Sequence, residues 1–302
     1  MATSPTDAWP SLPYDAFAPT GHLLHMGLQA IGKLSLWKPF EPEWANVALE
    51  VTSRGLTTGL VPLGSGAFSV DVDLLAHEIR CDTTSGKTGR VALGPMSVAE
   101  LTGRIDDMLG AAGVEARVNR MPQEVPHPVP FDEDRQPRPY DRALVHAWWR
   151  ILVSVHRVMQ RYHARFRGKT QPIGLMWGTF DLRDVRYDGR PVPPESGAGY
   201  IRRNAMDAAQ IEVGWWSGNE SYPKPAFYSF TYPQPEGVEH AKVKPAGSRW
   251  DPTLREFVLD YDDLRACAHP EADLLGFFES TYLAGAERAG WDPKLIGPAQ
   301  PV

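Results

Sequence analysis

Proline most constrains what this chain can fold into, because it fills 28 of the 302 positions. That is about 9%, against roughly 5% in an average protein. Proline fixes φ and lacks an N–H donor, so it interrupts helices and central strands. Six prolines and an acidic FDED run fall within residues 119–140, which therefore cannot form a helix or a central strand. We interpret this segment as a linker between two lobes, which suits the length of the chain.

The linker divides the chain into five predicted parts. These are a Pro-rich leader (1–19), an N-terminal α+β lobe (20–118), the linker (119–140), a C-terminal α+β lobe (141–292) and a tail (293–302). In the first lobe, Thr20 and Ser97 are placed to cap helices over 20–37 and 97–112. Short runs bounded by Gly and Ser predict strands at 46–51, 58–63, 67–73, 78–82 and 90–93.

The C-terminal lobe repeats this order of elements. Asp141 is placed to cap a long helix that stops at Gly168, and a closing helix is predicted over 271–289. Strands are predicted between them at 175–182, 185–187, 211–216, 227–232 and 256–259. The fold class is thus α+β, with two pseudo-repeated lobes that each consist of an antiparallel sheet flanked by helices. If the repeat is real, His25 and His146 are equivalent, and we expect the site in the interlobe cleft.

Composition excludes several classes of protein. The net charge of −6 and the pI near 5.9 argue against a nucleic-acid partner, which would need a basic face. With only Cys81 and Cys267, a disulfide framework or a four-cysteine zinc site is impossible, and we expect the cytoplasm. The N-terminus resembles no signal peptide and no stretch has about 18 consecutive apolar residues, so we expect no membrane partner.

Familiar motifs fail on spacing. Ser85–Thr88 reads SGKT, but Cys81 stands where a phosphate-binding loop needs its first glycine. The His77–Glu78 pair lacks the second histidine of a zinc motif, again because of Cys81. No dinucleotide GxGxxG or hydrolase GxSxG is present. We therefore expect no organic cofactor.

Two stretches carry candidate site residues. On the first helix, His25, Gln29 and Lys33 contribute polar groups in an apolar context. His25 and Gln29, one turn apart, fit a lined pocket and a satisfied buried pair equally well. In the strand predicted at 175–182, alternation places Trp177, Thr179 and Asp181 on one face. A buried face rarely includes an aspartate, so this face is a pocket candidate, although Asp181 can instead bond a loop or an arginine such as Arg54 or Arg183.

Several sequence runs resemble a known family: LHMGLQAIGK, VALEVTSRGLTT, PFDED, WGTFDL, AFYSFTYPQPEG and FFESTYLAGAERAGWD. Together, over residues 9–292, they resemble the bacterial family called domain of unknown function 5996. The resemblance implies an architecture but no activity. Family members typically carry a histidine where this chain has Gly174, and a His/Glu pair near Ala208 and Ala209. If those groups form a metal or acid/base cluster in relatives, this chain has a diverged activity or a binding role.

The leading hypothesis is a cofactor-independent enzyme acting on a small, largely apolar or aromatic organic molecule. His25 or His146 would transfer a proton, Gln29 would orient the substrate, and Arg54 would hold a carboxylate or enolate oxygen. This set of side chains suits an isomerisation, a cyclisation or an elimination. The substrate-binding walls are expected from aromatic residues, namely Trp149, Trp177, Trp215, Trp216 and Tyr228.

Two other functions remain open. A binding or accessory protein would hold a similar ligand without chemistry. A metalloenzyme would use His25 and His146 as ligands, but the sequence identifies no carboxylate to complete that site. The sequence predicts no particular substrate, reaction or oligomeric state.

Overall fold

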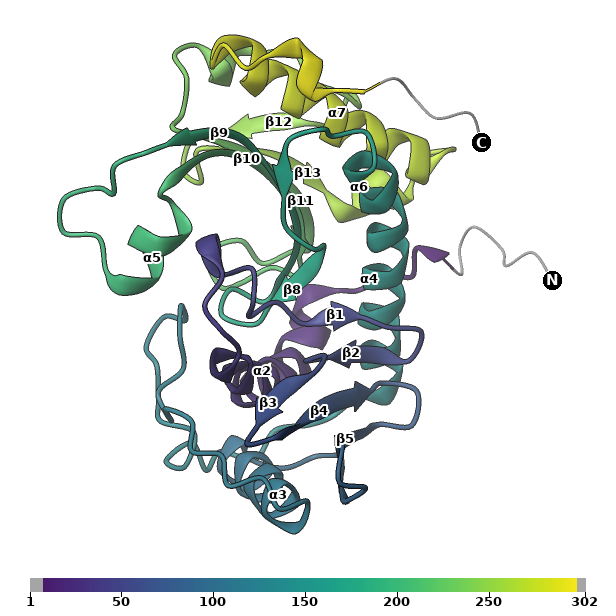
Figure 1. Ribbon diagram of the computed structural model, residues 1–302. Coiled ribbons are helices and arrows are strands. Elements are labelled where there is room, and N and C mark those ends of the chain that lie inside the picture. The colour runs from purple at the N-terminus through teal and green to yellow at the C-terminus, as the bar shows by residue number, and fades with distance from the viewer. Residues whose placement is uncertain (1–7, 298–302) are drawn as a thin grey trace.

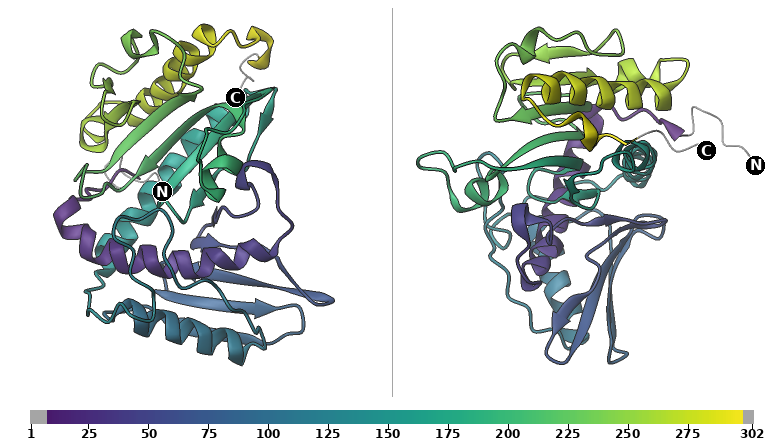
Figure 2. Two further views of the ribbon diagram at one scale, coloured as in Figure 1. Left: turned by 90° about the vertical axis from the view of Figure 1, so that its left-hand side faces the viewer. Right: turned by 45° about the horizontal axis from the view of Figure 1, so that its top comes forward.

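Two antiparallel sheets flanked by helices form the protein, so the predicted α+β class is confirmed (Figures 1 and 2). The computed structural model describes residues 8–297. The first seven residues of the predicted leader and the last five of the predicted tail lie outside this range. Within residues 8–297, no helix has the length and apolar character needed to cross a membrane.

The first sheet is an antiparallel meander with the strand order β1-β2-β4-β5-β6, and β3 pairs with β4. The predicted strand at 58–63 is wrong at its start, because Gly59 has φ 61° and separates β2 from β3. Helix α3 (Val98–Ala111) follows the sheet, and its predicted cap is confirmed: Ser97 Oγ accepts a hydrogen bond from Glu100 N. The strands are β1 (Glu50–Val51), β2 (Gly55–Thr57), β3 (Val61–Leu63), β4 (Gly66–Asp73), β5 (Glu78–Thr83) and β6 (Thr88–Ala92).

The second sheet has the order β12-β13-β11-β10-β9-β7, and β8 pairs with β9. The strand predicted at 175–182 is wrong. The chain turns back after Met176, where Phe180 has φ 62° and its N–H donates to the Met176 carbonyl. The strands are β7 (Lys169–Thr170), β8 (Gly174–Met176), β9 (Asp181–Pro191), β10 (Ala208–Trp216), β11 (Ala226–Tyr232), β12 (Arg249–Asp251) and β13 (Glu256–Asp260).

Helix α2 (Tyr14–Gly32) begins well before the predicted start at residue 20, and it accommodates Pro19 within its N-terminal part. It continues as a 3₁₀ turn, η1 (Lys33–Trp37). Helix α4 (Arg142–His163) has the predicted cap, in which the Asp141 carboxylate accepts from two backbone N–H groups. The remaining helical segments are η2 (Pro42–Trp44), α5 (Tyr200–Ala205), η3 (Val238–His240), α6 (Tyr261–Arg265), α7 (Pro270–Arg288) and η4 (Pro293–Leu295).

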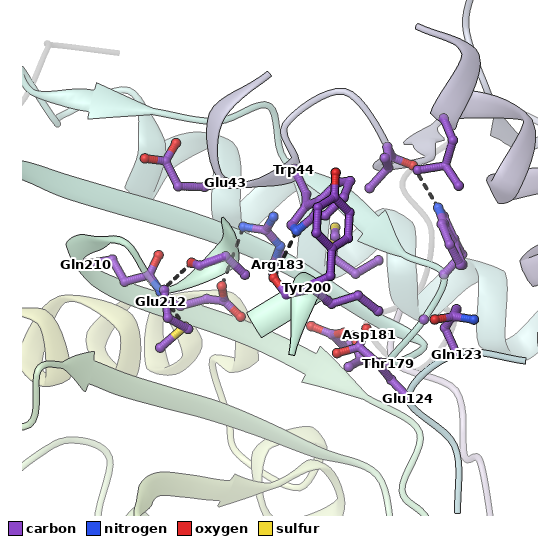
Figure 3. A pocket seen from close by; sticks show the side chains of 18 of the residues that line it. Glu43, Trp44, Gln123, Glu124, Thr179, Asp181, Arg183, Tyr200, Gln210 and Glu212 are labelled. Carbon is purple, nitrogen blue, oxygen red and sulfur yellow. Dashed lines mark hydrogen bonds and ion pairs between the residues drawn. The ribbon is translucent and has the colours of Figure 1, made fainter. Parts of the chain in front are cut away.

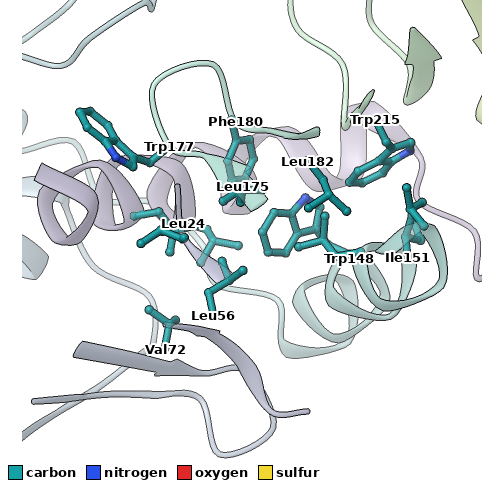
Figure 4. Close-up of a cluster of buried hydrophobic side chains, with 14 of the residues drawn as sticks. Leu24, Leu56, Val72, Trp148, Ile151, Leu175, Trp177, Phe180, Leu182 and Trp215 are labelled. Carbon is teal, nitrogen blue, oxygen red and sulfur yellow. The ribbon is translucent and has the colours of Figure 1, made fainter. Parts of the chain in front are cut away.

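Both halves of the chain contribute to one hydrophobic core (Figure 4). Trp148 of α4 lies at its centre, with its ring 6.5 Å from that of Phe17 on α2 and 5.1 Å from that of Phe180 in the turn before β9. Residues 112–141, which include the predicted linker, contain no helix or sheet strand. The two sheets are therefore fixed against each other by a shared core and by a chain segment that crosses between them.

Candidate functional site

A cavity of about 390 Å³ lies between the second sheet, the segment around η1 and η2, and residues 119–124 (Figure 3). Its apolar lining is Leu36, Trp44, Val47, Met176, Trp177, Tyr187, Tyr200, Ile201, Ala205, Met206 and Phe230. Its charged lining is Lys33, Glu43, Glu124, Asp181, Arg183 and Glu212. A concave space with aromatic and aliphatic walls and several convergent polar groups is typical of a small-molecule site.

Three of the charged residues that line the cavity, Asp181, Arg183 and Glu212, come from one face of the second sheet. Side chains alternate between faces along a strand, and the register sets Arg183 of β9 opposite Gly214 of β10, which in turn lies opposite Tyr228 of β11. Asp181 and Glu212 are on this face by the same alternation. Helices α4 and α7 cover the other face, which carries apolar residues such as Trp215.

The Tyr228 hydroxyl bridges the carboxyl groups of Asp181 and Glu212 on this face. Its hydroxyl lies 2.8 Å from Glu212 Oε1 and is also hydrogen-bonded to Asp181 Oδ2. The ring can lie against β10 because residue 214 is glycine; a Cβ there would be 2.2 Å from Tyr228 Cζ. One hydroxyl proton can be donated to only one carboxylate. Both contacts become hydrogen bonds when one of the two carboxyls is protonated, so the Asp181–Tyr228–Glu212 group is arranged to share a proton.

Burial is the main reason why Asp181 and Glu212 hold a proton more tightly than exposed carboxyl groups do. It raises the pKa of Glu212 and of Asp181, and the charge of Asp181 adds to the shift at Glu212. The same burial, with repulsion from Glu212 and Asp181, raises the pKa of Glu256 to about 8. Arg183 opposes these shifts, with Nη1 3.5 Å from Glu212 Oε2. The group is thus arranged to exchange protons near neutral pH.

Arg183 is held in place by hydrogen bonds on its other side. Its Nη2 donates to Gln171 Oε1 at 2.7 Å, and Gln171 Nε2 donates to the Tyr187 hydroxyl at 2.8 Å and to the Glu43 carbonyl at 3.0 Å. The Glu43 carboxylate is paired with Lys169, 2.5 Å away. The guanidinium is therefore preorganised beside the shared proton.

Both interpretations that the sequence left open find support here: Gln29 is buried and hydrogen-bonded, whereas the half-buried His25 borders a second hollow of about 620 Å³. His25 Nε2 lies 2.9 Å from the Trp177 carbonyl, and burial lowers the pKa of the ring to about 4. Gln29 Oε1 accepts from Gln123 N at 2.7 Å, and its Nε2 donates to Gln123 O at 2.8 Å. The pair fastens α2 to the turn before β9 and to the linker, and neither residue lines the cavity.

Lys33, Trp177, Thr179 and Asp181, from the two predicted stretches, do line the cavity. Lys33 Nζ donates to the carbonyls of Asn119 and Met121 at 2.7 and 2.5 Å, and burial lowers its pKa to about 8. Trp177 Nε1 donates to the Val47 carbonyl at 3.1 Å. Thr179 donates to Asp181. Three of these four groups lie in the turn and the start of β9, not on one strand face.

The other predicted site residues lie elsewhere. His146 stands at the start of α4 with its ring 5.6 Å from that of Trp149, and the structure does not bring it together with His25. Arg54 is half-exposed on the first sheet, paired with Asp73. Trp215 is fully buried on the helix-covered face. Trp216 borders a separate hollow of about 620 Å³.

The predicted metal pair receives no support from this placement. Across the part of the chain that the structure describes, no group of three or more His, Cys, Asp and Glu side chains is arranged to hold a metal ion. His25, which is half-buried, already has its Nε2 beside two backbone carbonyls.

The sequence did carry a signal for one residue that our predictions missed. Glu212 interrupts an apolar run in a strand, as Asp181 does, and alternation places it with Gln210 and Gly214. No local pattern pointed to Gln171 or Trp44, because long-range contacts alone bring them to the cavity.

Residues 9–297 match the model of a family described as "Family of unknown function (DUF5996)", and the chain belongs to this family. The resemblance inferred from its motifs is thereby confirmed. No curated protein and no solved structure matches the chain. Gly174 packs against Ala48, whose Cβ would be 2.8 Å from a Cβ at residue 174.

Proposed function

We propose that this DUF5996 member is an enzyme that acts by acid–base chemistry on a small, largely apolar or aromatic organic molecule. The observation that carries the proposal is the position of the Tyr228 hydroxyl between Asp181 and Glu212, which both line a cavity with aromatic walls. Such a group offers a proton donor and a proton acceptor side by side. We place the activity in the cytoplasm, where Cys81 and Cys267 would stay free thiols.

The chemistry follows from the shared proton. One carboxyl gives its proton to a substrate oxygen or carbon, and the other carboxylate removes a proton from a neighbouring substrate atom. Tyr228 passes the proton between the two carboxyls, so the group returns to its starting state. Arg183 stabilises negative charge that develops on the substrate. Isomerisation, cyclisation and elimination all fit this cycle. This assigns proton transfer to carboxyl groups in place of His25 and His146.

The cavity walls define the substrate class. Trp44, Trp177 and Phe230 contribute rings, and Met176 and Met206 contribute flexible apolar surface. These side chains suit a ligand with an aromatic or aliphatic body. A carbonyl or hydroxyl group on that body would meet the Asp181–Tyr228–Glu212 group. No organic cofactor takes part in the proposed reaction.

A binding or accessory role is the second candidate, and one observation favours it. All four carboxyl oxygens of Asp181 and Glu212 already have partners within the protein: Thr179, Tyr228 and Arg183. A group satisfied in this way can hold a ligand without exchanging protons with it. In that case the ligand would be bound and released unchanged.

The test is incubation of the protein with the small-molecule fraction of a bacterial cell extract, followed by mass spectrometry. The wild type and the control Glu78→Gln, altered in an ion pair with Arg90 on the first sheet, should deplete the same compound and form the same product. Glu212→Gln should form that product at least 100-fold more slowly, the scale typical for loss of a general acid or base.

The outcomes separate the candidates. Equal turnover by Glu212→Gln and the wild type would refute the acid–base proposal. Retention of one compound by all three proteins, without any product after long incubation, would support the binding role instead.

A further inference from the structure

The connection between β9 and β10 forms a flap over the cavity. Residues 192–207, named the flap here, leave the sheet after Pro191 and return at Ala208, and these two residues are paired across the ladder. The flap contains the short helix α5 and extends beyond the ends of β9 and β10 (Figure 1). Connections of this length between neighbouring strands are uncommon, and long loops often act as lids.

The flap covers the cavity but adds little to the core. Tyr200, Ile201, Ala205 and Met206 line the cavity from this side. None of the residues of α5 is buried. The ion pair between Glu195 and Arg202 lies within the flap and does not attach it to the rest of the protein. A segment with few buried contacts opens more readily than the sheet beneath it.

One side chain fastens the far end of the flap. Trp44 Nε1 donates to the Ile201 carbonyl at 3.0 Å, and the Trp44 ring meets the Tyr200 ring edge-on, with centroids 5.4 Å apart. Near the return to β10, Gln210 Nε2 donates to the Ala205 carbonyl at 3.2 Å. Trp44 itself stands on a firm base, because the adjacent Glu43 is ion-paired with Lys169 of β7.

We propose that the flap is the gate through which a ligand enters and leaves the cavity, and that Trp44 is its latch. This inference rests on the proposed function, since it takes the cavity to be the ligand site. Opening breaks the Trp44–Ile201 hydrogen bond and parts two rings, while the strands and their register stay as they are. Such gating commonly sets the rate of substrate entry or product release.

The first test needs no ligand. Trp44→Phe keeps an aromatic ring but removes the indole N–H, and loss of one hydrogen bond should raise the open population about fivefold. Hydrogen exchange read by mass spectrometry should speed up by that factor in residues 195–206 and stay unchanged in β9 and β10. Trp149→Phe is the matched control, because Trp149 Nε1 has no hydrogen-bond partner and Trp149 does not line the cavity. Unchanged exchange in the flap of Trp44→Phe would overturn the proposal.

The second test measures entry directly, with 4-fluorobenzyl alcohol as the probe and fluorine NMR as the readout. In Trp44→Phe, a gate that opens about five times more often raises the association rate by about that factor, whereas a change in Kd reports the altered cavity wall. Entry by another route, past Glu124 and Thr179, which also border the neighbouring hollow, predicts an unchanged association rate and would overturn the gate. A weaker Kd with an unchanged association rate would make Trp44 only a wall of the site, which also contradicts the latch. Failure of the probe to bind the wild type counts against the proposed function. The hydrogen-exchange comparison of Trp44→Phe with the wild type then tests the gate by itself.

Discussion

Gly214→Ala should displace Tyr228 and thereby dismantle the shared-proton group. A Cβ at residue 214 would lie 2.2 Å from Tyr228 Cζ and 2.4 Å from its hydroxyl oxygen. These atoms cannot coexist, and the clash is with the ring and with the hydroxyl held by both carboxyls. Overpacking costs about 1–3 kcal/mol, and loss of a hydrogen bond to a charged group costs about 1.5–3 kcal/mol. We therefore expect the free energy of unfolding to fall by about 2.5–6 kcal/mol.

Urea denaturation of four proteins isolates the cause of that loss. The proteins are the wild type, Gly214→Ala, Tyr228→Ala and the double variant. Because Tyr228→Ala removes the ring that the new Cβ would strike, Gly214→Ala should cost less than about 1 kcal/mol in that background. Gly276→Ala in α7 is the control, since nothing lies within 4 Å of its Cβ position. A loss below about 1 kcal/mol for Gly214→Ala, or an equal loss in both backgrounds, would refute the reasoning.

Three further predictions concern pH and the clamp on the linker. Because the pKa of Glu256 is raised to about 8, the folded state binds more protons than the unfolded state above about pH 4.5. The free energy of unfolding should therefore fall from pH 5 to 8. Glu256→Gln should flatten that slope in urea titrations. The hydrogen bond to buried Asp184 raises the pKa of His163. His163→Gln should therefore destabilise the protein by about 1–2 kcal/mol at pH 6 and by less at pH 9. An equal loss of stability at both pH values would contradict the pairing of His163 with Asp184. Gln29→Ala removes both hydrogen bonds with the Gln123 backbone and should lower the free energy of unfolding by about 2–4 kcal/mol. Hydrogen exchange at residues 119–124 should become faster. Protection there as in the wild type would show that these hydrogen bonds are dispensable.

Local chemistry made part of the fold predictable. The caps at Ser97 and Asp141 were found because a cap needs only a side-chain oxygen next to free N–H groups. The strand at 175–182 failed for the opposite reason: Phe180 adopts a left-handed conformation that its own sequence does not favour, and the packing of its ring against Trp148 holds it there.

The candidate site was predictable to a smaller extent. Asp181 was identified because a carboxylate in an apolar run has to be compensated when it is buried, and Glu212 carries the same signal. The period of α2 could not distinguish a pocket from a satisfied pair at His25 and Gln29, because both uses place polar groups one turn apart. The partner that fixes Gln29, the backbone of Gln123, is distant in sequence.

The measurement that tests the central claim most directly is the titration of the carboxyl carbons of Asp181 and Glu212 by carbon-13 NMR. Resonances are assigned by their loss in Asp181→Asn and Glu212→Gln. The shared proton predicts that at least one of the two carboxyls stays protonated well above the ordinary range near pH 4, and that Tyr228→Phe shifts its midpoint. Ionisation of both carboxyls below about pH 5, unaffected by Tyr228→Phe, would contradict the account.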